Sequence, residues 1–289
     1  MTNILQAIAT IIDNPVPDLV SHYKIQKNNR TNAVGDALEY FVKDAFANTI
    51  NEPELSNKLE KYDEVFSWMR GNKNNPPDLM IRNGDAIEIN KIKNSSATIQ
   101  LNSSYPKSKL FSDHPQIISA CRDCETWTEK DIVYAIGATS DDNTKENLKT
   151  LWFVYGDCYA ASKEYYEGIR DQIVTGINAI PDVEFSETKE LGRVNKVDKL
   201  DITELRIRGM WVIKNPSKVF DYIDTGSNPQ KKFQIIAIMK ESKYLSFPLD
   251  SRTKIESISV PGFNINSQSI KCPDNPDNLI PAKIITYKI

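Results

Sequence analysis

The 289-residue chain has few cysteines, few histidines and no long apolar run. Four cysteines do not make a disulfide scaffold in a chain of this length, which favours a reducing, cytoplasmic location. No apolar run approaches the ~20 residues of a membrane span, and residues 1–12 lack the basic start of a secretory signal. There is no glycine-rich phosphate loop, and His22 and His114 are too far apart in sequence to suggest a catalytic set. These absences predict a cytoplasmic protein with no membrane association.

The net charge of −3 argues against a general nucleic-acid coat protein, but the charge is distributed unevenly. Residues 91–109 contain four lysines and no acid, and residues 189–218 contain eight Lys/Arg against four acids. Local basic stretches in a mildly acidic protein fit a DNA cleft better than a coat. Ordinary solvated side chains remain the alternative for any one of these lysines and arginines.

A predicted hairpin at residues 76–93 is the feature around which the chain is organised. Residues 79–81 form a short apolar strand, residues 83–85 a turn, and residues 86–92 a second strand. The hairpin puts Asp78 at the mouth of the first strand and Glu88 in the middle of the second. A buried acid costs several kcal/mol unless it is paired or binds a metal. Two converging carboxylates suit a hard cation such as Mg²⁺, although an ordinary hairpin with solvated acids gives the same pattern.

The remaining pattern predicts an α/β protein, a mixed sheet flanked by helices. Residues 1–25 give a helix stopped by prolines and a second apolar turn, residues 26–32 a loop, and residues 35–46 an amphipathic helix. Strands are expected at residues 62–69, 97–101, 132–139, 151–157, 202–213 and 233–239, a basic turn at residues 191–199, and a helix at residues 160–180 with Tyr165, Ile169, Ile173 and Ile177 facing inward. We therefore expect a core over residues 1–184 and a β-rich C-terminal extension over residues 185–289 that contributes to DNA recognition, with no linker between them.

Pro77-Asp78 and the Glu88-Ile89-Asn90 tripeptide resemble the metal site of the PD-(D/E)xK nuclease superfamily. Segments at residues 35–39, 75–78, 84–88, 101–107, 191–195 and 205–211 are similar to the NgoPII-type family of type II restriction endonucleases. The resemblance implies a Mg²⁺-dependent, homodimeric enzyme that cuts double-stranded DNA at a short palindromic site of the GGCC kind. It also implies that Glu39, on the helix before the hairpin, is an additional acid facing the metal. The alternative for Glu39 is a capping box with Asp36, in which it only caps the helix.

Position 90 departs from the family pattern, which has lysine where this chain has Asn90. Three interpretations follow: a natural polar substitute, a bulge that swings Lys91 inward, or an engineered, inactivated variant. An amide can orient a water molecule but cannot take its proton, so we expect reduced or absent cleavage with DNA binding retained. A non-catalytic, sequence-specific DNA-binding protein on a nuclease fold is the competing function.

Two basic or polar runs supply candidate DNA contacts. They are Asn102, Ser103, Ser104, Tyr105 and Lys107 after the hairpin, and Arg193, Asn195, Lys196, Arg206 and Arg208 in the last third. Cys121 and Cys124 form a lone C-x-x-C pair, which Cys158, Cys272 or His114 could complete as a zinc site. Ordinary, partly buried cysteines are the interpretation we favour.

Overall fold

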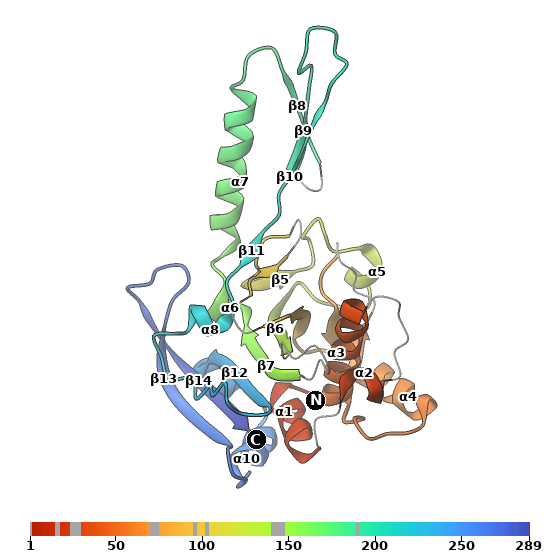
Figure 1. Ribbon diagram of the computed structural model, residues 1–289, viewed down its shortest axis with the longest axis vertical. Helices are drawn as coiled ribbons and strands as arrows, with labels where there is room; N and C mark the ends of the chain where they lie inside the picture. Colours follow the sequence, from red (N-terminus) through yellow and green to blue (C-terminus); the bar gives the residue numbers. More distant parts are fainter. Residues whose placement is uncertain are drawn as a thin grey trace.

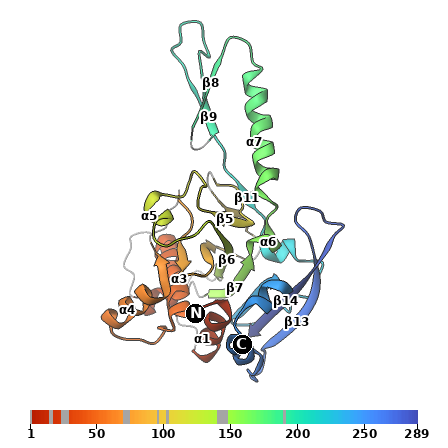
Figure 2. The same cartoon turned by 180° about the vertical axis from the view of Figure 1, so that it is seen from behind.

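The computed structural model describes residues 2–14, 18–23, 30–69, 75–94, 97–101, 104–139, 148–188 and 191–289. It has a body built on one large sheet, from which a helix and a small sheet project as an arm (Figures 1 and 2). None of the helices in these ranges is long and apolar enough to cross a membrane.

The described part of the chain forms a nine-stranded mixed sheet in the body, with the order β1-β2-β3-β6-β7-β12-β14-β13 and β5 paired to β6. The strands are β1 (Phe66–Trp68), β2 (Leu79–Ile81), β3 (Ala86–Ile92), β5 (Lys109–Phe111), β6 (Glu129–Thr139), β7 (Leu148–Tyr155), β12 (Gln234–Lys240), β13 (Asn264–Lys271) and β14 (Leu279–Lys288). β3 runs parallel to β6, and β7 parallel to β12, while the other pairs are antiparallel. The predicted α/β class and the hairpin of β2 and β3 are confirmed. Residues 234–288 thus share a sheet with the hairpin.

Helix α3 (Arg30–Ala47) packs against β3 and places its apolar stripe on the sheet. A Cβ at Gly137 of β6 would lie 2.6 Å from a methyl group of Leu38, so the glycine permits this close approach. The helix was expected to begin at Gly35, but it begins at Arg30. Asp36 and Glu39 therefore lie inside the helix, and the capping-box interpretation of Glu39 is wrong.

The other helices of the body are short. α1 (Ile4–Asp13) packs against α3 and against α10 (Leu249–Glu256). α4 (Leu55–Val65) occupies the first half of the stretch expected to be a strand at residues 62–69, which leaves only β1 extended. The remainder are α2 (Leu19–His22), α5 (Ser119–Arg122), α6 (Gly156–Tyr159), α8 (Pro216–Val219) and α9 (Glu241–Ser246).

The arm consists of α7 (Lys163–Asn178) and an antiparallel sheet of β8 (Glu184–Glu187), β9 (Leu191–Asn195) and β10 (Leu205–Arg208) (Figure 1). The predicted helix is confirmed, but its predicted inward face is wrong. Tyr165, Ile169 and Ile173 are 58%, 50% and 46% exposed, and Ile177 is half-buried. The reason is that α7 leaves the body, and its partner in the arm is a sheet of short strands. The expected turn at residues 191–199 is also wrong at its start, since β9 occupies it.

A two-stranded sheet of β4 (Ile99–Gln100) and β11 (Val212–Ile213) connects the end of the arm to the segment after β3. The backbone N–H of Leu101 extends this pairing by donating to the carbonyl of Trp211, 2.9 Å away. The expectation that residues 97–101 extend the main sheet is therefore wrong. Their partner is the strand that leads out of the arm.

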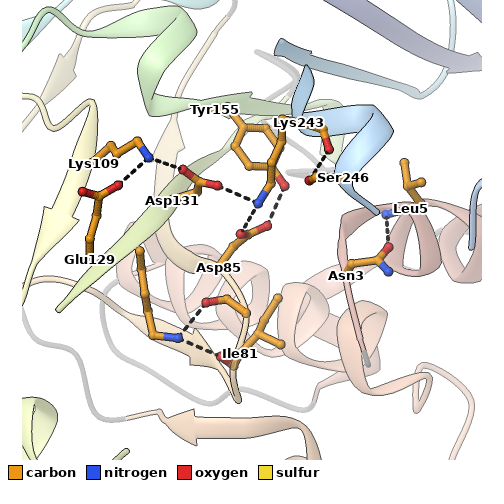
Figure 3. Close-up of polar contacts among 12 residues, drawn as sticks. Asn3, Leu5, Ile81, Asp85, Lys109, Glu129, Asp131, Tyr155, Lys243 and Ser246 are labelled. Carbon is orange, nitrogen blue, oxygen red and sulfur yellow. Dashed lines mark hydrogen bonds and ion pairs between the residues drawn. The ribbon is translucent and has the colours of Figure 1, made fainter. Parts of the chain in front are cut away.

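A buried ionic network fixes the turn between β2 and β3 (Figure 3). Nζ of Lys243, on α9, lies 2.6 Å from a carboxylate oxygen of Asp85 and 2.7 Å from one of Asp131. The hydroxyl of Tyr155 donates to the other oxygen of Asp85 at 2.6 Å. Asp85 is 7% exposed, so both of its oxygens are paired inside the protein. The hairpin is thereby tied to β6, β7 and the C-terminal third of the chain.

Replacement of Asp85 by alanine should lower the free energy of unfolding by about 2 kcal/mol, because the buried Tyr155 hydroxyl loses its acceptor and Lys243 keeps only Asp131 as a counter-charge. Denaturant unfolding followed by circular dichroism measures the change. Lys61→Ala is the control, since Lys61 pairs with Glu64 at an exposed position and its loss should change stability by less than about 0.5 kcal/mol. Equal stability of the two variants would contradict the role given to Asp85.

Candidate active site

The carboxylate of Asp78 is held at the edge of β3. β2 pairs with β3 only through Leu79 and Met80, and beyond that pairing the backbone N–H of Ile89 donates to Oδ2 of Asp78 at 2.7 Å. The preceding residue is fixed as well, because the indole N–H of Trp68 donates to the carbonyl of Pro77 at 3.0 Å. The acid of the first strand is therefore held beside the residue that follows Glu88.

Glu88 and Asn90 share one face of β3, and Lys91 lies on the other. β3 pairs with β6 in an unbroken parallel register that places Glu88 beside Tyr134 and Lys91 beside Gly137. Because Gly137 contacts Leu38 of α3, Lys91 faces the side covered by that helix. A bulge that would turn Lys91 toward Glu88 is absent from this pairing, which removes that interpretation of the motif.

Two buried polar atoms of this face have no hydrogen-bond partner in the described part of the chain: Oε2 of Glu88 and Nδ2 of Asn90. Buried polar groups are normally paired, so an unpaired carboxylate oxygen indicates a position that a ligand completes. Asp78 and Glu88 could hold Mg²⁺ as a pair, because Mg²⁺ in proteins commonly takes one or two carboxylates and keeps several waters.

The site disfavours ionisation of both carboxylates. Burial raises the pKa of Asp78, against the hydrogen bond from Ile89, and the negative charge of Glu39 raises it further. Burial raises the pKa of Glu88, and the charges of Asp78 and Glu39 add to the effect. Lys43 favours the charged form of Asp78 and Lys107 that of Glu88. A divalent cation would remove this repulsion.

Glu39 is half-buried on α3 and acts on both acids through its charge. In the ranges that the structure describes, no three acid, histidine or cysteine side chains lie close enough together to hold one metal ion. Glu39 thus stands farther from the pair than a direct shared ligand would, and only Asp78 and Glu88 form the candidate metal centre.

Lys107 lies inside the protein, although the sequence suggested a DNA contact. The residue is 5% exposed, and its Nζ donates to the hydroxyl of Ser104 and, at 3.3 Å, to the carbonyl of Tyr105. Burial lowers the pKa of Lys107 to about 8, and the charge of Glu88 opposes that shift. Lys107 and Glu88 line the same small cavity, of about 20 Å³. The sequence does not reveal that Lys107 lies beside Glu88, because there Lys107 belongs to a polar run of candidate DNA contacts. Asn102 and Ser103 of that run lie outside the described residues.

Tyr105 connects the active site to the arm. Its ring stacks on Tyr166 of α7 with 5.3 Å between ring centroids, and Trp211 contacts it edge-on at 6.2 Å. Its hydroxyl donates to Glu167 at 3.1 Å. Tyr105 lines both the small cavity beside Glu88 and a cavity of about 780 Å³ between the body and the base of the arm. The ring of Tyr105 therefore packs between the body and the arm.

Most of the DNA-contact residues predicted in the last third lie on one face of the arm sheet. Arg206 is directly opposite Arg193, and alternation adds Asn195 and Arg208 to the same face. Lys196 follows the end of β9 and pairs with Glu184, while Arg193 pairs with Glu204 at 3.2 Å. Phe185, Val194 and Ile207 line the opposite, apolar face. The sheet is thus amphipathic, with a basic face and an apolar face.

The cysteines show ordinary packing contacts. Cys121 is buried against the sulfur of Met80, 3.5 Å away, and the thiol of Cys124 donates to the carbonyl of Cys121 at 3.0 Å. Burial raises the pKa of the Cys121 thiol to about 12, which holds it in the protonated form. All four cysteines are free thiols.

Comparisons with known proteins identify the family of the chain. The model of the NgoPII restriction endonuclease family matches residues 2–271. The chain is 46% identical over 287 residues to a protein named type II restriction enzyme NgoPII, from Neisseria gonorrhoeae, and the match covers 99% of this chain and 100% of that protein. The chain belongs to the NgoPII restriction endonuclease family. The resemblance noted in the sequence is confirmed, and the chain is an enzyme of the type II restriction class. No solved structure matches the chain, so the fold rests on the sheet and helices described above.

Glu88→Gln should stabilise the metal-free protein, because it removes a buried charge that repels Asp78. Since the folded-state pKa of Glu88 is raised, its contribution to stability is complete below the ordinary pKa near 4.5 and is lost as pH rises through the folded-state value. The variant should therefore exceed the parent in unfolding free energy by a margin that grows as pH rises above about 4.5, to roughly 1 kcal/mol or more. Thermal unfolding in chelator at several pH values measures this, and a margin that shrinks with pH would refute it.

Proposed function

We propose that this enzyme hydrolyses phosphodiester bonds in double-stranded DNA at a short palindromic site, with Mg²⁺ bound by Asp78 and Glu88. The observation that carries the proposal is the buried, unpartnered Oε2 of Glu88 beside the fixed carboxylate of Asp78. Membership of the restriction endonuclease family supports it. The GGCC site implied by the resemblance is the first duplex to test.

In the proposed reaction the oxygen of a water molecule bonds to phosphorus, the bond to one ester oxygen breaks, and a proton passes from the water to solvent while the leaving oxygen gains one. Asp78 and Glu88 would hold the cation, and Glu39 adds negative charge from α3. When bound, Mg²⁺ would supply Lewis-acid polarisation of the phosphate and make an attacking water more acidic. Asn90 lies on the face of Glu88 and orients the water through its amide.

The competing proposal is a DNA-binding protein that does no chemistry, and Asn90 is its support. With asparagine alone at this position cleavage would be weak, because an amide accepts no proton. A paired assay separates the two functions, with binding followed in Ca²⁺ and cleavage in Mg²⁺.

Asp78→Asn should reduce the rate of Mg²⁺-dependent cleavage of a GGCC duplex by at least ~100-fold while the protein remains folded, because half of the metal site is lost. Single-turnover assays with the parent and with a duplex of scrambled site provide the comparison. Cleavage that persists in Asp78→Asn would rule out the site, and equal cutting of both duplexes would rule out GGCC.

For recognition, we propose that the basic face of the arm sheet reads the bases. Arg193→Ala and Arg208→Ala should each weaken binding of the specific duplex by about 10–100-fold in Ca²⁺, since one bidentate arginine–base contact contributes about 1–3 kcal/mol. Thermal unfolding should be almost unchanged. Lys254→Ala, at an exposed position on α10, is the control and should bind as the parent does. Unaltered affinity in both arginine variants would contradict this assignment.

We propose further that the enzyme is a homodimer and that α7 pairs with a second copy of the chain. No residue of α7 is buried, yet Tyr165, Ile169 and Ile173 recur every four residues as a half-exposed apolar stripe, of which Ile169 and Ile173 line the open cavity at the base of the arm. Exposed apolar stripes of this kind mark interaction surfaces. A palindromic site presents the same contacts twice, which a twofold dimer matches.

Ile169→Asp should shift the protein toward monomer, because it places a charge in the proposed apolar contact. Sedimentation equilibrium measures the change, with circular dichroism to verify folding. Leu55→Asp is the matched control, since Leu55 is 67% exposed on α4, away from the arm. An unchanged association state in Ile169→Asp would place the dimer surface elsewhere.

A further inference from the structure

The candidate metal site has two acids, but strand β3 brings no positive charge to them. Position 90 is asparagine, and Lys91 faces the side covered by α3. A nuclease site that accumulates negative charge on a phosphate needs a cation besides the metal or an equivalent donor. The charge must then come from another segment of the chain.

Lys107 is brought to the acids by Tyr134, the residue beside Glu88 in the parallel ladder. The Tyr134 hydroxyl accepts a hydrogen bond from the backbone N–H of Lys107 at 2.7 Å and donates to its carbonyl at 3.3 Å. Gly156, at the start of α6, allows the segment to approach, because a Cβ there would collide with the carbonyl oxygens of Lys107 and Ser108. The backbone of Lys107 is thus fixed from two sides.

The side chain of Lys107 completes the arrangement. It is 5% exposed, its hydrogen-bond acceptors in Ser104 and Tyr105 are neutral, and its Nζ lies 4.7 Å from the centroid of the Tyr105 ring. Glu88 supplies the negative charge that favours its protonated form. The cavity that the two residues share, of about 20 Å³, has room for about one water molecule.

We propose that Lys107 takes the place of the lysine missing at position 90, contacting the attacking water or the scissile phosphate from a segment outside β3. The enzyme then cuts DNA with asparagine at position 90, which replaces the expectation of an impaired site. This inference rests on the proposed nuclease function. It also assigns Lys107 to the chemistry instead of to DNA binding.

The test compares cleavage by the parent with Lys107→Met, Asn90→Lys and the double variant Asn90→Lys/Lys107→Met, under single turnover in Mg²⁺. Lys107→Met should cut about 100-fold more slowly, with duplex affinity in Ca²⁺ within threefold of the parent. The double variant should recover at least tenfold, because it returns a lysine to the same face of the site. Asn90→Lys is the reference for the double variant: losing Lys107 should slow Asn90→Lys by less than the ~100-fold by which it slows the parent, since a second lysine then remains at the site.

Lys91→Met is the matched control, because Lys91 lies one residue from position 90 but on the opposite face of β3. Its rate should stay within threefold of the parent. Lys43→Met tests the other lysine near the acids, which is half-buried on α3 and influences Asp78. A loss in Lys43→Met or Lys91→Met with full activity in Lys107→Met would overturn the proposal and assign the charge to that residue.

Calorimetric titration with Ca²⁺ in the absence of DNA gives a readout independent of activity. Removing a positive charge beside Glu88 should tighten Ca²⁺ binding by about threefold or more in Lys107→Met and leave it unchanged in Lys91→Met. A lysine whose charge does not act on the metal site would not produce this change. Unaltered Ca²⁺ affinity in a folded Lys107→Met therefore overturns the proposal.

The remaining outcomes separate this inference from the proposed function. If the parent does not cut and Asn90→Lys does, Lys107 supplies no active-site charge, the inference fails and the nuclease function stands. This comparison of the parent with Asn90→Lys remains decisive even if Lys107→Met does not fold. If Asp78→Asn removes cleavage while Lys107→Met keeps the full rate, the inference again fails alone. If neither the parent nor Asn90→Lys cuts or binds DNA, the proposed function itself fails.

Discussion

The parallel pairing of β3 with β6 is the constraint on which the candidate site depends. It places Glu88 beside Tyr134, and Tyr134 in turn holds the backbone of Lys107. The same register turns Lys91 toward α3. Because side chains alternate along a strand, a shift of one residue would exchange these faces and remove Glu88 from the cavity. One ladder of hydrogen bonds thus fixes residues from three separate segments.

The hairpin carries two kinds of buried charge with opposite effects on stability. At its turn, Asp85 is satisfied by Lys243 and Tyr155, so the charge is compensated within the fold. At the other end of the hairpin, Asp78 and Glu88 are half-buried, and burial raises the pKa of both more than the charges of Lys43 and Lys107 lower it. The contacts of Asp85 stabilise the fold. The carboxylates of Asp78 and Glu88 instead destabilise it when both are ionised, until a ligand of opposite charge binds.

The hairpin could be predicted because its signals are local: a turn dipeptide, an apolar strand on each side and an acid where an apolar residue is expected. Lys107 could not, because its burial depends on Tyr134, 27 residues away in sequence, and on Gly156. The periodicity of α7 correctly indicated a helix. The same periodicity could not predict which element covers the apolar stripe, because it shows which side of the helix is apolar but not what packs against that side. For the same reason β4 was assigned to the wrong sheet.

The pairing of β4 with β11 links the arm to the segment beside the candidate active site. β11 ends the arm, and β4 leads into the segment that carries Tyr105 and Lys107. Tyr105 is in addition stacked on Tyr166 of α7, so both ends of the arm contact that segment. A displacement of the arm would therefore also displace the segment that carries the lysine. In such a molecule, a poorly fitting sequence held by the arm would be penalised in the rate of strand scission as well as in residence time.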